Sequence, residues 1–217
     1  MWDNAIAKFE KGKIEIDPHI NDKNDLRRGI TLLLKPDKKL LNSFGDFIKD
    51  AVSKEPGEYF YKPAEIHVTV LSIINCSADF NLSQIYLPDY IDYIETSLIN
   101  IQPFEIEFKG ITASPSCILI QGFPQNNVLE LMRNNLREKF KIGTLYNSID
   151  SRYKIETAHC TVLRFIKELI NMKVFIDFLK ENRDKYFGNT LVSEIELVYT
   201  DWYHKEENVR ELHKFKL

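Results

Sequence analysis

Two short sequences, HVTV at residues 67–70 and HCTV at residues 159–162, strongly limit how this chain folds. Each places a histidine and, two positions later, a threonine in an otherwise apolar run, which predicts a strand. Alternate side chains of a strand point to the same face, so the histidine and threonine of each motif lie side by side. The chain is therefore expected to present the same polar pair twice from two rigid elements.

The elements predicted around the two motifs follow the same order in each half: strand, helix, motif strand, helix, strand. Apolar residues alternate in the predicted strands and recur at steps of three and four in the predicted helices. The strands are expected at 29–35, 65–74, 104–112, 117–123, 157–166, 193–203 and 209–217, and the helices at about 37–52, 88–99, 127–140 and 171–184. Because motif, order and spacing recur together, we infer an internal duplication.

A chain of 217 residues is long enough for one domain with a sizeable core, and no low-complexity linker separates its halves. We expect a single domain over 1–217. Residues 1–28 form an N-terminal extension with one short helix, 29–112 the first repeat and 113–217 the second. Such halves can pack about a pseudo-twofold axis, with both motif strands facing a shared groove.

Composition and charge exclude several classes of protein. The net charge of −3 gives no global basic field, which argues against a duplex-DNA binder. No apolar run approaches the length of a membrane span, and the N-terminus lacks the apolar stretch of a signal peptide. The three cysteines form no C-x-x-C pair, which indicates reduced thiols. We expect a cytoplasmic protein without membrane contact, and the sequence gives no sign of the oligomeric state.

The residue types of the two motifs suit the chemistry of phosphodiesters. Imidazole titrates near neutrality, so two histidines facing one cleft can divide the work of accepting and donating a proton. Two hydroxyls can donate hydrogen bonds to anionic oxygens. No carboxylate cluster or H-x-H pair indicates a metal site, so neither a metal nor another cofactor is expected. A packing role would explain one His-x-Thr, but two among five histidines have a chance probability of roughly 2–3%.

Paired H-x-T-hydrophobic motifs, one in each half of a duplicated chain, resemble the two-histidine (2H) phosphoesterase superfamily, which includes 2′-5′ RNA ligase-like proteins and cyclic phosphodiesterases. HCTVLR, with Arg164 five residues after His159, is similar to the second motif of the ligase-like branch. The C-terminal VRELHKFKL is similar to its closing strand, and FYKPAEIHVTVLS resembles bacterial members. The resemblance covers roughly residues 29–217 and leaves the N-terminal extension outside.

The resemblance implies a bilobal α+β fold in which two antiparallel sheets flank a central groove and the helices lie outside. It also implies metal-independent attack on 2′,3′-cyclic phosphates or 2′,5′-linked phosphodiesters of nucleotides or RNA ends. By position, His67 and His159 would be the general acid and base, in an order that the sequence does not fix. Thr69 and Thr161 would hold the non-bridging phosphate oxygens.

Loops that lead into the predicted strands supply further candidates for substrate binding: Tyr61, Arg152, Tyr153 and Arg28. Aromatic rings there can stack on a base and cations can meet a phosphate. The loop at 141–155 is expected to act as a specificity lid. Strict alternation turns Arg164 away from His159, into an ion pair at the edge of the core, unless a bulge intervenes.

The remaining histidines, His19, His204 and His213, lack a threonine two positions later, and no role is expected for them. Cys160 is expected to point into the core. Three alternatives stay open: a protein that binds RNA ends or cyclic nucleotides without turnover, an RNA 2′-5′ ligase, and a sugar-isomerising enzyme. The last leaves the two threonines unexplained, and no nucleotide-activating motif supports the ligase.

Overall fold

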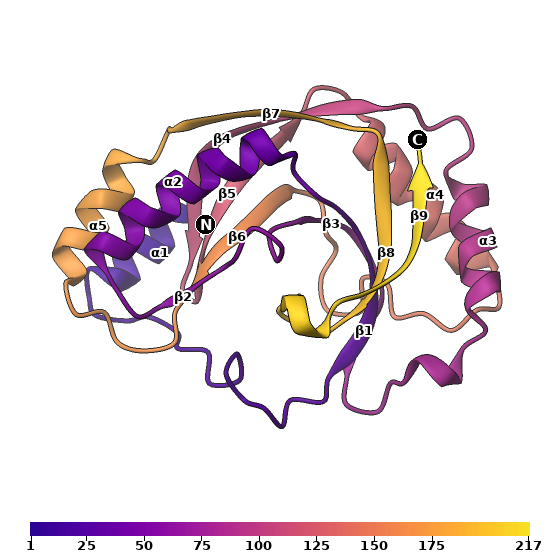
Figure 1. Cartoon of the computed structure of the whole chain (residues 1–217), viewed down its shortest axis with the longest axis horizontal. Helices are drawn as coiled ribbons and strands as arrows, with labels where there is room; N and C mark the ends of the chain where they lie inside the picture. Colours follow the sequence, from indigo (N-terminus) through magenta and orange to yellow (C-terminus); the bar gives the residue numbers. More distant parts are fainter.

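The computed structural model describes residues 1–217 as an α+β fold of two antiparallel sheets with helices on the outside (Figure 1). The strands are β1 (Arg28–Leu34), β2 (Tyr59–Phe60), β3 (Val68–Ser77), β4 (Phe104–Ser114), β5 (Cys117–Pro124), β6 (Ala158–Arg164), β7 (Tyr186–Val192), β8 (Glu194–Thr200) and β9 (Arg210–Lys216). The helices are α1 (Trp2–Phe9), α2 (Lys38–Lys54), α3 (Leu87–Ser97), α4 (Val128–Ile142) and α5 (Met172–Glu181), with 3₁₀ turns η1 (Leu82–Gln84) and η2 (Glu206–Asn208). The predicted fold class is confirmed.

The strands and helices expected from the sequence are present, with bounds shifted by a few residues. β3 begins at Val68, so His67 lies at the last position before the strand. Two strands were not expected, the short β2 and the longer β7. In β7 the alternation is interrupted by Gly188, whose φ of 129° is accessible to glycine but rarely to other residues. That interruption hides β7 from a search for regular alternation.

Each sheet combines strands from both halves of the sequence. The four-stranded sheet has the order β3-β1-β8-β9, and the five-stranded sheet has the order β2-β6-β5-β4-β7. The orders β3-β1-β8 and β6-β5-β4 correspond to each other. In each, the third strand comes from the other half of the sequence. The two motif strands, β3 and β6, therefore occupy equivalent positions in different sheets.

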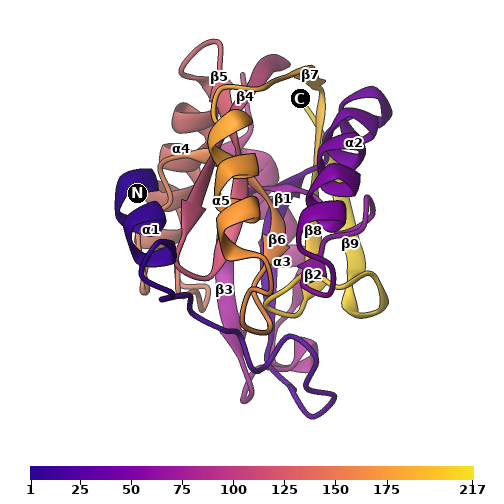
Figure 2. The same cartoon turned by 90° about the vertical axis from the view of Figure 1, so that its left-hand side faces the viewer.

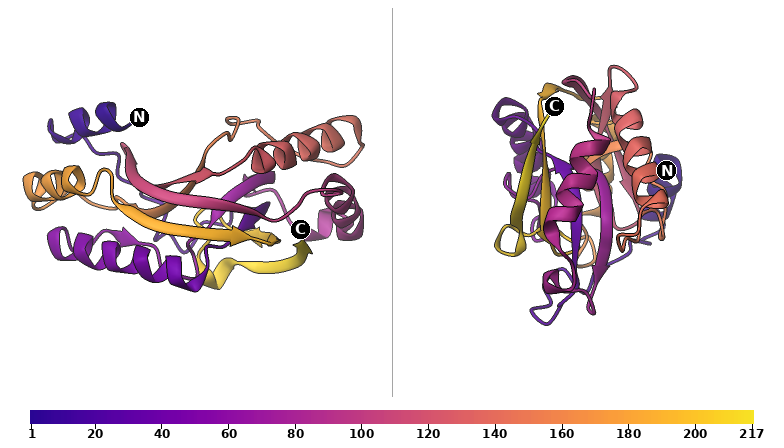
Figure 3. Two further views of the ribbon diagram at one scale, coloured as in Figure 1. Left: turned by 90° about the horizontal axis from the view of Figure 1, so that it is seen from above. Right: turned by 90° about the vertical axis from the view of Figure 1, so that its right-hand side faces the viewer.

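The helices cover the outer faces of the two sheets and leave the motif strands facing inward (Figures 1 and 2). α2 and α5 pack against each other and against the five-stranded sheet, and α3 and α4 pack together beside β3 (Figure 3). Phe44 of α2 contacts Phe108 and Phe187, with ring centroids 5.4 Å from each. Burial of such rings stabilises the position of the sheets that carry the motifs.

The N-terminal segment is part of the packed structure. Ala5, Ile6 and Phe9 of α1 are buried, and the ring of Phe9 contacts that of Phe165 at 5.3 Å. From α1 the chain passes along one end of the space between the sheets before it enters β1 (Figure 1). None of the helices combines the length and the apolar character that crossing a membrane requires.

Candidate active site

A cavity open to solvent lies between the sheets, where β3 and β6 face each other. Its lining comes from both motif strands, from the loop between α4 and β6, and from the connection between β8 and β9. The lining residues are Thr31, Tyr61, His67, Thr69, Leu71, Ser72, Asn75, Cys76, Asp150, Arg152, Tyr153, Ile155, His159, Thr161, Arg164, Trp202, Tyr203 and His204. Both predicted His-x-Thr pairs thus line one cavity.

His67 is held in one tautomer by its own main chain. Its Nδ1 lies 2.7 Å from the carbonyl oxygen of Glu65, and a carbonyl can only accept, so Nδ1 carries the proton. In the neutral ring, Nε2 then carries a lone pair. Burial, with smaller contributions from His159 and Lys35, lowers the pKa of His67 to about 4, so the ring is neutral at pH 7.

His159 occupies the equivalent position on the other sheet but has a different partner. Its Nδ1 lies 3.1 Å from the hydroxyl oxygen of Thr157, which can donate or accept. The neutral ring can therefore present either a lone pair or an N–H at Nε2. Burial, followed by the charge of Arg133, lowers the pKa of His159 below its ordinary value.

A bulge follows each His-x-Thr pair. Leu32 pairs with Leu71 whereas its neighbour Leu33 pairs with Thr69, so the intervening residue of β3, Val70, has no partner on β1. In the second sheet, β5 pairs with β6 in the same way and leaves Val162 without a partner. An extra residue shifts the alternation of the side chains that follow.

The bulge in β6 turns Arg164 to the same side as Thr161, and Arg164 lines the cavity. The expectation from strict alternation, that Arg164 faces away from His159, is therefore wrong. The expected ion pair is present, since Arg164 Nη1 lies 3.4 Å from Asp17 Oδ2. Arg164 also donates from Nε to the hydroxyl of Tyr61 at 3.3 Å. The equivalent bulge in β3 brings Ser72 to the cavity.

Arg133 of α4 connects the two motif strands from behind the cavity. Its side chain is buried and donates to the carbonyl oxygens of Val70 at 2.8 Å, Thr69 at 2.9 Å and Thr157 at 3.0 Å. Burial, together with the nearby charge of Arg137, lowers the pKa of Arg133 to about 10. The group remains a cation at pH 7 and lies close to the histidine pair without a carboxylate partner.

The connection between β8 and β9 adds three aromatic residues that the sequence motifs do not reveal. Trp202, Tyr203 and His204 line the cavity, and the ring of His204 lies 3.9 Å from that of His67, between centroids. His204 has a φ of 55°, an uncommon conformation for a residue other than glycine. The pKa of His204 is lowered well below its ordinary value, mainly by burial and then by His67. The sequence feature that could have indicated these three residues is the cluster of aromatic rings in DWYH, at 201–204.

Three of the four residues predicted to contact substrate line the cavity. Tyr61 is almost fully buried, and burial raises its pKa to about 12. Arg152 lies over the ring of Trp202 at 4.4 Å and donates to a main-chain carbonyl, and Tyr153 is 64% exposed. Arg28 lies outside the cavity and donates to Asn208 and to nearby carbonyls. No group of three or more His, Cys, Asp or Glu side chains is placed to hold a metal ion.

Comparison with known proteins shows which solved structures share this fold. No protein-family model and no curated protein sequence matches the chain. Solved structures do match: TT0787 of Thermus thermophilus is 18% identical with a TM-score of 0.63, over 88% of this chain and 97% of that chain. Escherichia coli LigT in complex with 3′-AMP is 12% identical with a TM-score of 0.55, over 88% of this chain and 98% of LigT. A structure described as a phosphoesterase gives 12% identity, a TM-score of 0.56 and the same coverage.

The predicted fold of two antiparallel sheets with helices outside is thus shared with these solved structures over most of the chain. At 12–18% identity, the likeness concerns the fold.

Proposed function

We propose that the protein is a metal-independent phosphoesterase of the two-histidine superfamily, which hydrolyses 2′,3′-cyclic phosphates or 2′,5′-linked phosphodiesters of nucleotides or RNA ends. The observation that carries this proposal is the arrangement of His67 with Thr69 and of His159 with Thr161 around one cavity, from two different sheets. Structures of E. coli LigT with 3′-AMP and with phosphate have the same fold, which supports a nucleotide as the ligand.

His67 is assigned the role of general base. Because its Nδ1–H is donated to the carbonyl of Glu65 and the ring is neutral, Nε2 offers a lone pair to the cavity. There it can accept the proton of an attacking water molecule, while the oxygen of that water bonds to phosphorus.

His159 is assigned the role of general acid. An imidazolium donates its Nε2 proton to the ribose oxygen that leaves as its bond to phosphorus breaks. Burial lowers the pKa of His159 in the free protein, but a phosphate anion in the cavity acts in the opposite direction and favours the charged ring. Substrate binding would then charge the acid at the point where its proton is needed.

Thr69 and Thr161 are assigned the role of holding the non-bridging oxygens of the phosphate. Each hydroxyl lies next to its histidine on the same face of a strand, so both can donate to one anion between the sheets. The cation of Arg133 adds favourable electrostatics from behind the two strands, because its charge is not balanced by a carboxylate. Tyr153 and the stacked pair of Arg152 and Trp202 offer ring and guanidinium faces for a base.

The experiment that tests the proposal measures turnover of 2′,3′-cyclic nucleotides and 2′,5′-linked dinucleotides in EDTA. His67→Ala and His159→Ala should each reduce kcat/KM by roughly 10²–10⁴-fold if each ring transfers a proton. His213→Ala is the matched control, because His213 pairs with Glu95 and does not line the cavity.

Activity that requires added metal, or that survives both cavity substitutions, would refute the proposal. Binding of nucleotides without any turnover would instead identify a binding protein.

A further inference from the structure

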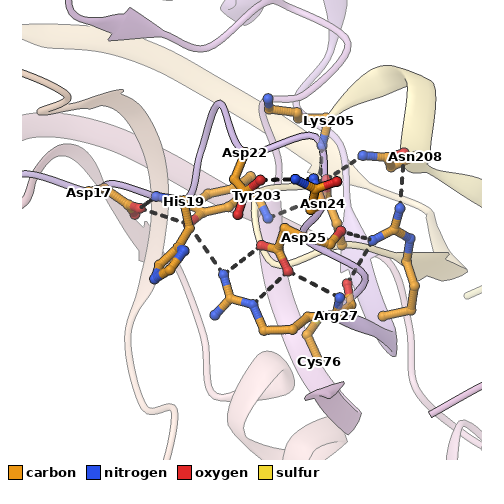
Figure 4. A network of polar contacts seen from close by, with 12 residues as sticks. Asp17, His19, Asp22, Asn24, Asp25, Arg27, Cys76, Tyr203, Lys205 and Asn208 are labelled. Atoms are coloured by element: carbon orange, nitrogen blue, oxygen red, sulfur yellow. Dashed lines mark hydrogen bonds and ion pairs between the residues drawn. The ribbon is translucent and has the colours of Figure 1, made fainter. Parts of the chain in front are cut away.

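The N-terminal segment brings a carboxylate to one end of the cavity. Residues 10–27 connect α1 to β1 and pass beside the β8–β9 connection (Figures 1 and 4). Within this segment, the main-chain N–H of Asp17 donates to the carbonyl of Phe165 at 2.8 Å. That bond fixes the segment against the residue that follows β6, so the position of the Asp17 side chain is set by the main chain.

Asp17 joins the two sheets across this end of the cavity. Its Oδ1 accepts a hydrogen bond from the hydroxyl of Tyr203 at 2.8 Å, and its Oδ2 lies 3.4 Å from Nη1 of Arg164 (Figure 4 shows the Tyr203 side). Arg164 ends β6 of one sheet, and Tyr203 follows β8 of the other. Both partners line the cavity, so the carboxylate lies at its edge.

The Asp17–Arg164 pair is shielded from water. The exposed fractions of the two side chains are 13% and 16%, far below those of the surface pairs of this protein, such as Lys49 with Asp46 at 80% and 73%. Charges that are removed from water interact more strongly than exposed charges. The charge of Arg164 is therefore largely neutralised by Asp17 before any ligand enters.

The other arginine of the cavity differs in this respect. Arg152 stacks on Trp202 and donates to the carbonyl of Cys76, and it forms no ion pair. An anionic group therefore meets an unbalanced cation at the Arg152 end. At the Arg164 end it meets a guanidinium that already has a carboxylate, which also repels the anion.

We propose that Asp17 is a specificity-determining residue, which closes the Arg164 end of the cavity to the second phosphate group of a ligand whose first phosphate lies at the histidine pair. The identity of that first phosphate rests on the proposed function. The closure itself rests on Asp17, Arg164 and Tyr203. A ligand whose second phosphate would lie at the Arg164 end is then disfavoured in the wild-type protein and gains affinity once the carboxylate is neutral.

The test compares the affinities of adenosine 3′-monophosphate and adenosine 3′,5′-bisphosphate by calorimetry. Asp17→Asn keeps the side-chain oxygen that accepts from Tyr203 but removes the charge opposite Arg164. We expect it to raise the ratio of bisphosphate to monophosphate affinity by about tenfold, the size of one charge-assisted hydrogen bond. Asp17→Ser provides a second neutral variant, with the same expected direction.

Two controls test whether the change in the affinity ratio depends on the Asp17–Arg164 pair. Asp25→Asn removes a negative charge from the same segment, but its partner Arg27 does not line the cavity, so the ratio should stay at the wild-type value. In the Arg164→Met background, Asp17→Asn should no longer raise the ratio, because the cation that would bind the second phosphate is gone.

An unchanged ratio in folded Asp17→Asn and Asp17→Ser protein overturns the proposal. The proposal is also overturned if Asp25→Asn raises the affinity ratio equally, or if Asp17→Asn still raises it in the Arg164→Met background. The affinities do not depend on turnover, so a failure of the proposed hydrolysis appears separately, as inactive wild-type protein whose affinity ratio still responds to Asp17.

Discussion

The two His-x-Thr motifs occupy equivalent places in the two sheets, but their histidines have different partners. In both strands a bulge follows the threonine and brings the fifth residue after the histidine to the cavity. The residue two positions before the histidine supplies the Nδ1 partner in both, a main-chain carbonyl for His67 and the Thr157 hydroxyl for His159. Two strands in equivalent positions thus provide two rings with the same placement and different constraints on the proton.

The residues around the two rings also differ. His67 packs against the ring of His204, whereas His159 lies near the cation of Arg133. After the bulge, β3 presents Ser72 where β6 presents Arg164. The assignment of the two rings rests on their Nδ1 partners. The carbonyl of Glu65 fixes the tautomer of His67 that offers a lone pair at Nε2, whereas the Thr157 hydroxyl lets Nε2 of His159 carry a proton.

The largest effect is expected from breaking the link that both motifs share. Arg133→Met leaves the carbonyls of Thr69, Val70 and Thr157, in and just before the motif strands, without their donor, so the free energy of unfolding should fall by about 3 kcal/mol or more. Urea denaturation measures this loss. Arg137→Met is the matched control on the same helix. Arg137 pairs with Asp150 and is bonded to neither motif strand, so a smaller loss is expected, and an equal loss would contradict the role of Arg133.

A smaller effect is expected from a substitution that affects the second motif and leaves the first unchanged. Thr157→Val removes the hydroxyl partner of His159 Nδ1 and leaves the carbonyl partner of His67 in place. We expect kcat for cyclic-phosphate hydrolysis to fall by about tenfold, which corresponds to about 1.4 kcal/mol for one lost hydrogen bond. Steady-state kinetics at several pH values measures the change. No change in kcat would mean that this hydroxyl does not orient the ring.

Phosphate binding should change the protonation of His67. The pKa of about 4 results mainly from burial, and a bound anion favours the charged ring, so inorganic phosphate should raise this pKa. An NMR titration of the imidazole with and without phosphate measures the shift. His213, on the surface, is the internal reference. A pKa of His67 that phosphate leaves unchanged would place the anion elsewhere.

The last effect concerns the stability of the protein against acid, to which His67 and His204 are linked. Their folded pKa values lie below those of the unfolded chain, so between about pH 4 and about pH 6.5 the unfolded state binds more protons. The free energy of unfolding therefore falls as the pH is lowered from 7 towards 4. His204→Gln should weaken this dependence, as measured by urea denaturation at pH 7 and pH 5. An unaltered dependence would show that His204 does not contribute.

The sequence was sufficient to predict the elements that carry the motifs, because each is strongly periodic. The strands around Thr69 and Thr161 and the helices behind them have one continuous apolar face, and burial of that face decides both conformation and orientation. Their meeting in one cavity followed from the inferred duplication. The exchange of β4 and β8 between the sheets did not, since it depends on pairing between distant segments.

Features that depend on irregular backbone could not be predicted. The bulge at Val162 decides where Arg164 points, and a pattern of strict alternation gives the opposite side. His204 reaches the cavity through a turn with positive φ, which no sequence period reveals. Arg28 was predicted beside the site because it precedes the strand expected at 29–35, but it is the first residue of β1 and contacts Asn208 and nearby carbonyls.

The central claim is that two similar motifs perform opposite proton transfers, and a change of leaving group tests it most directly. A nucleoside phosphodiester with a p-nitrophenolate leaving group needs no general acid, whereas one with a ribose leaving group does. We predict that His159→Ala loses roughly 10²–10⁴-fold in kcat with the ribose leaving group and less than about tenfold with p-nitrophenolate, while His67→Ala loses the larger factor with both. Equal losses of the two variants with both substrates, or rescue of His67→Ala in place of His159→Ala, would contradict the assignment.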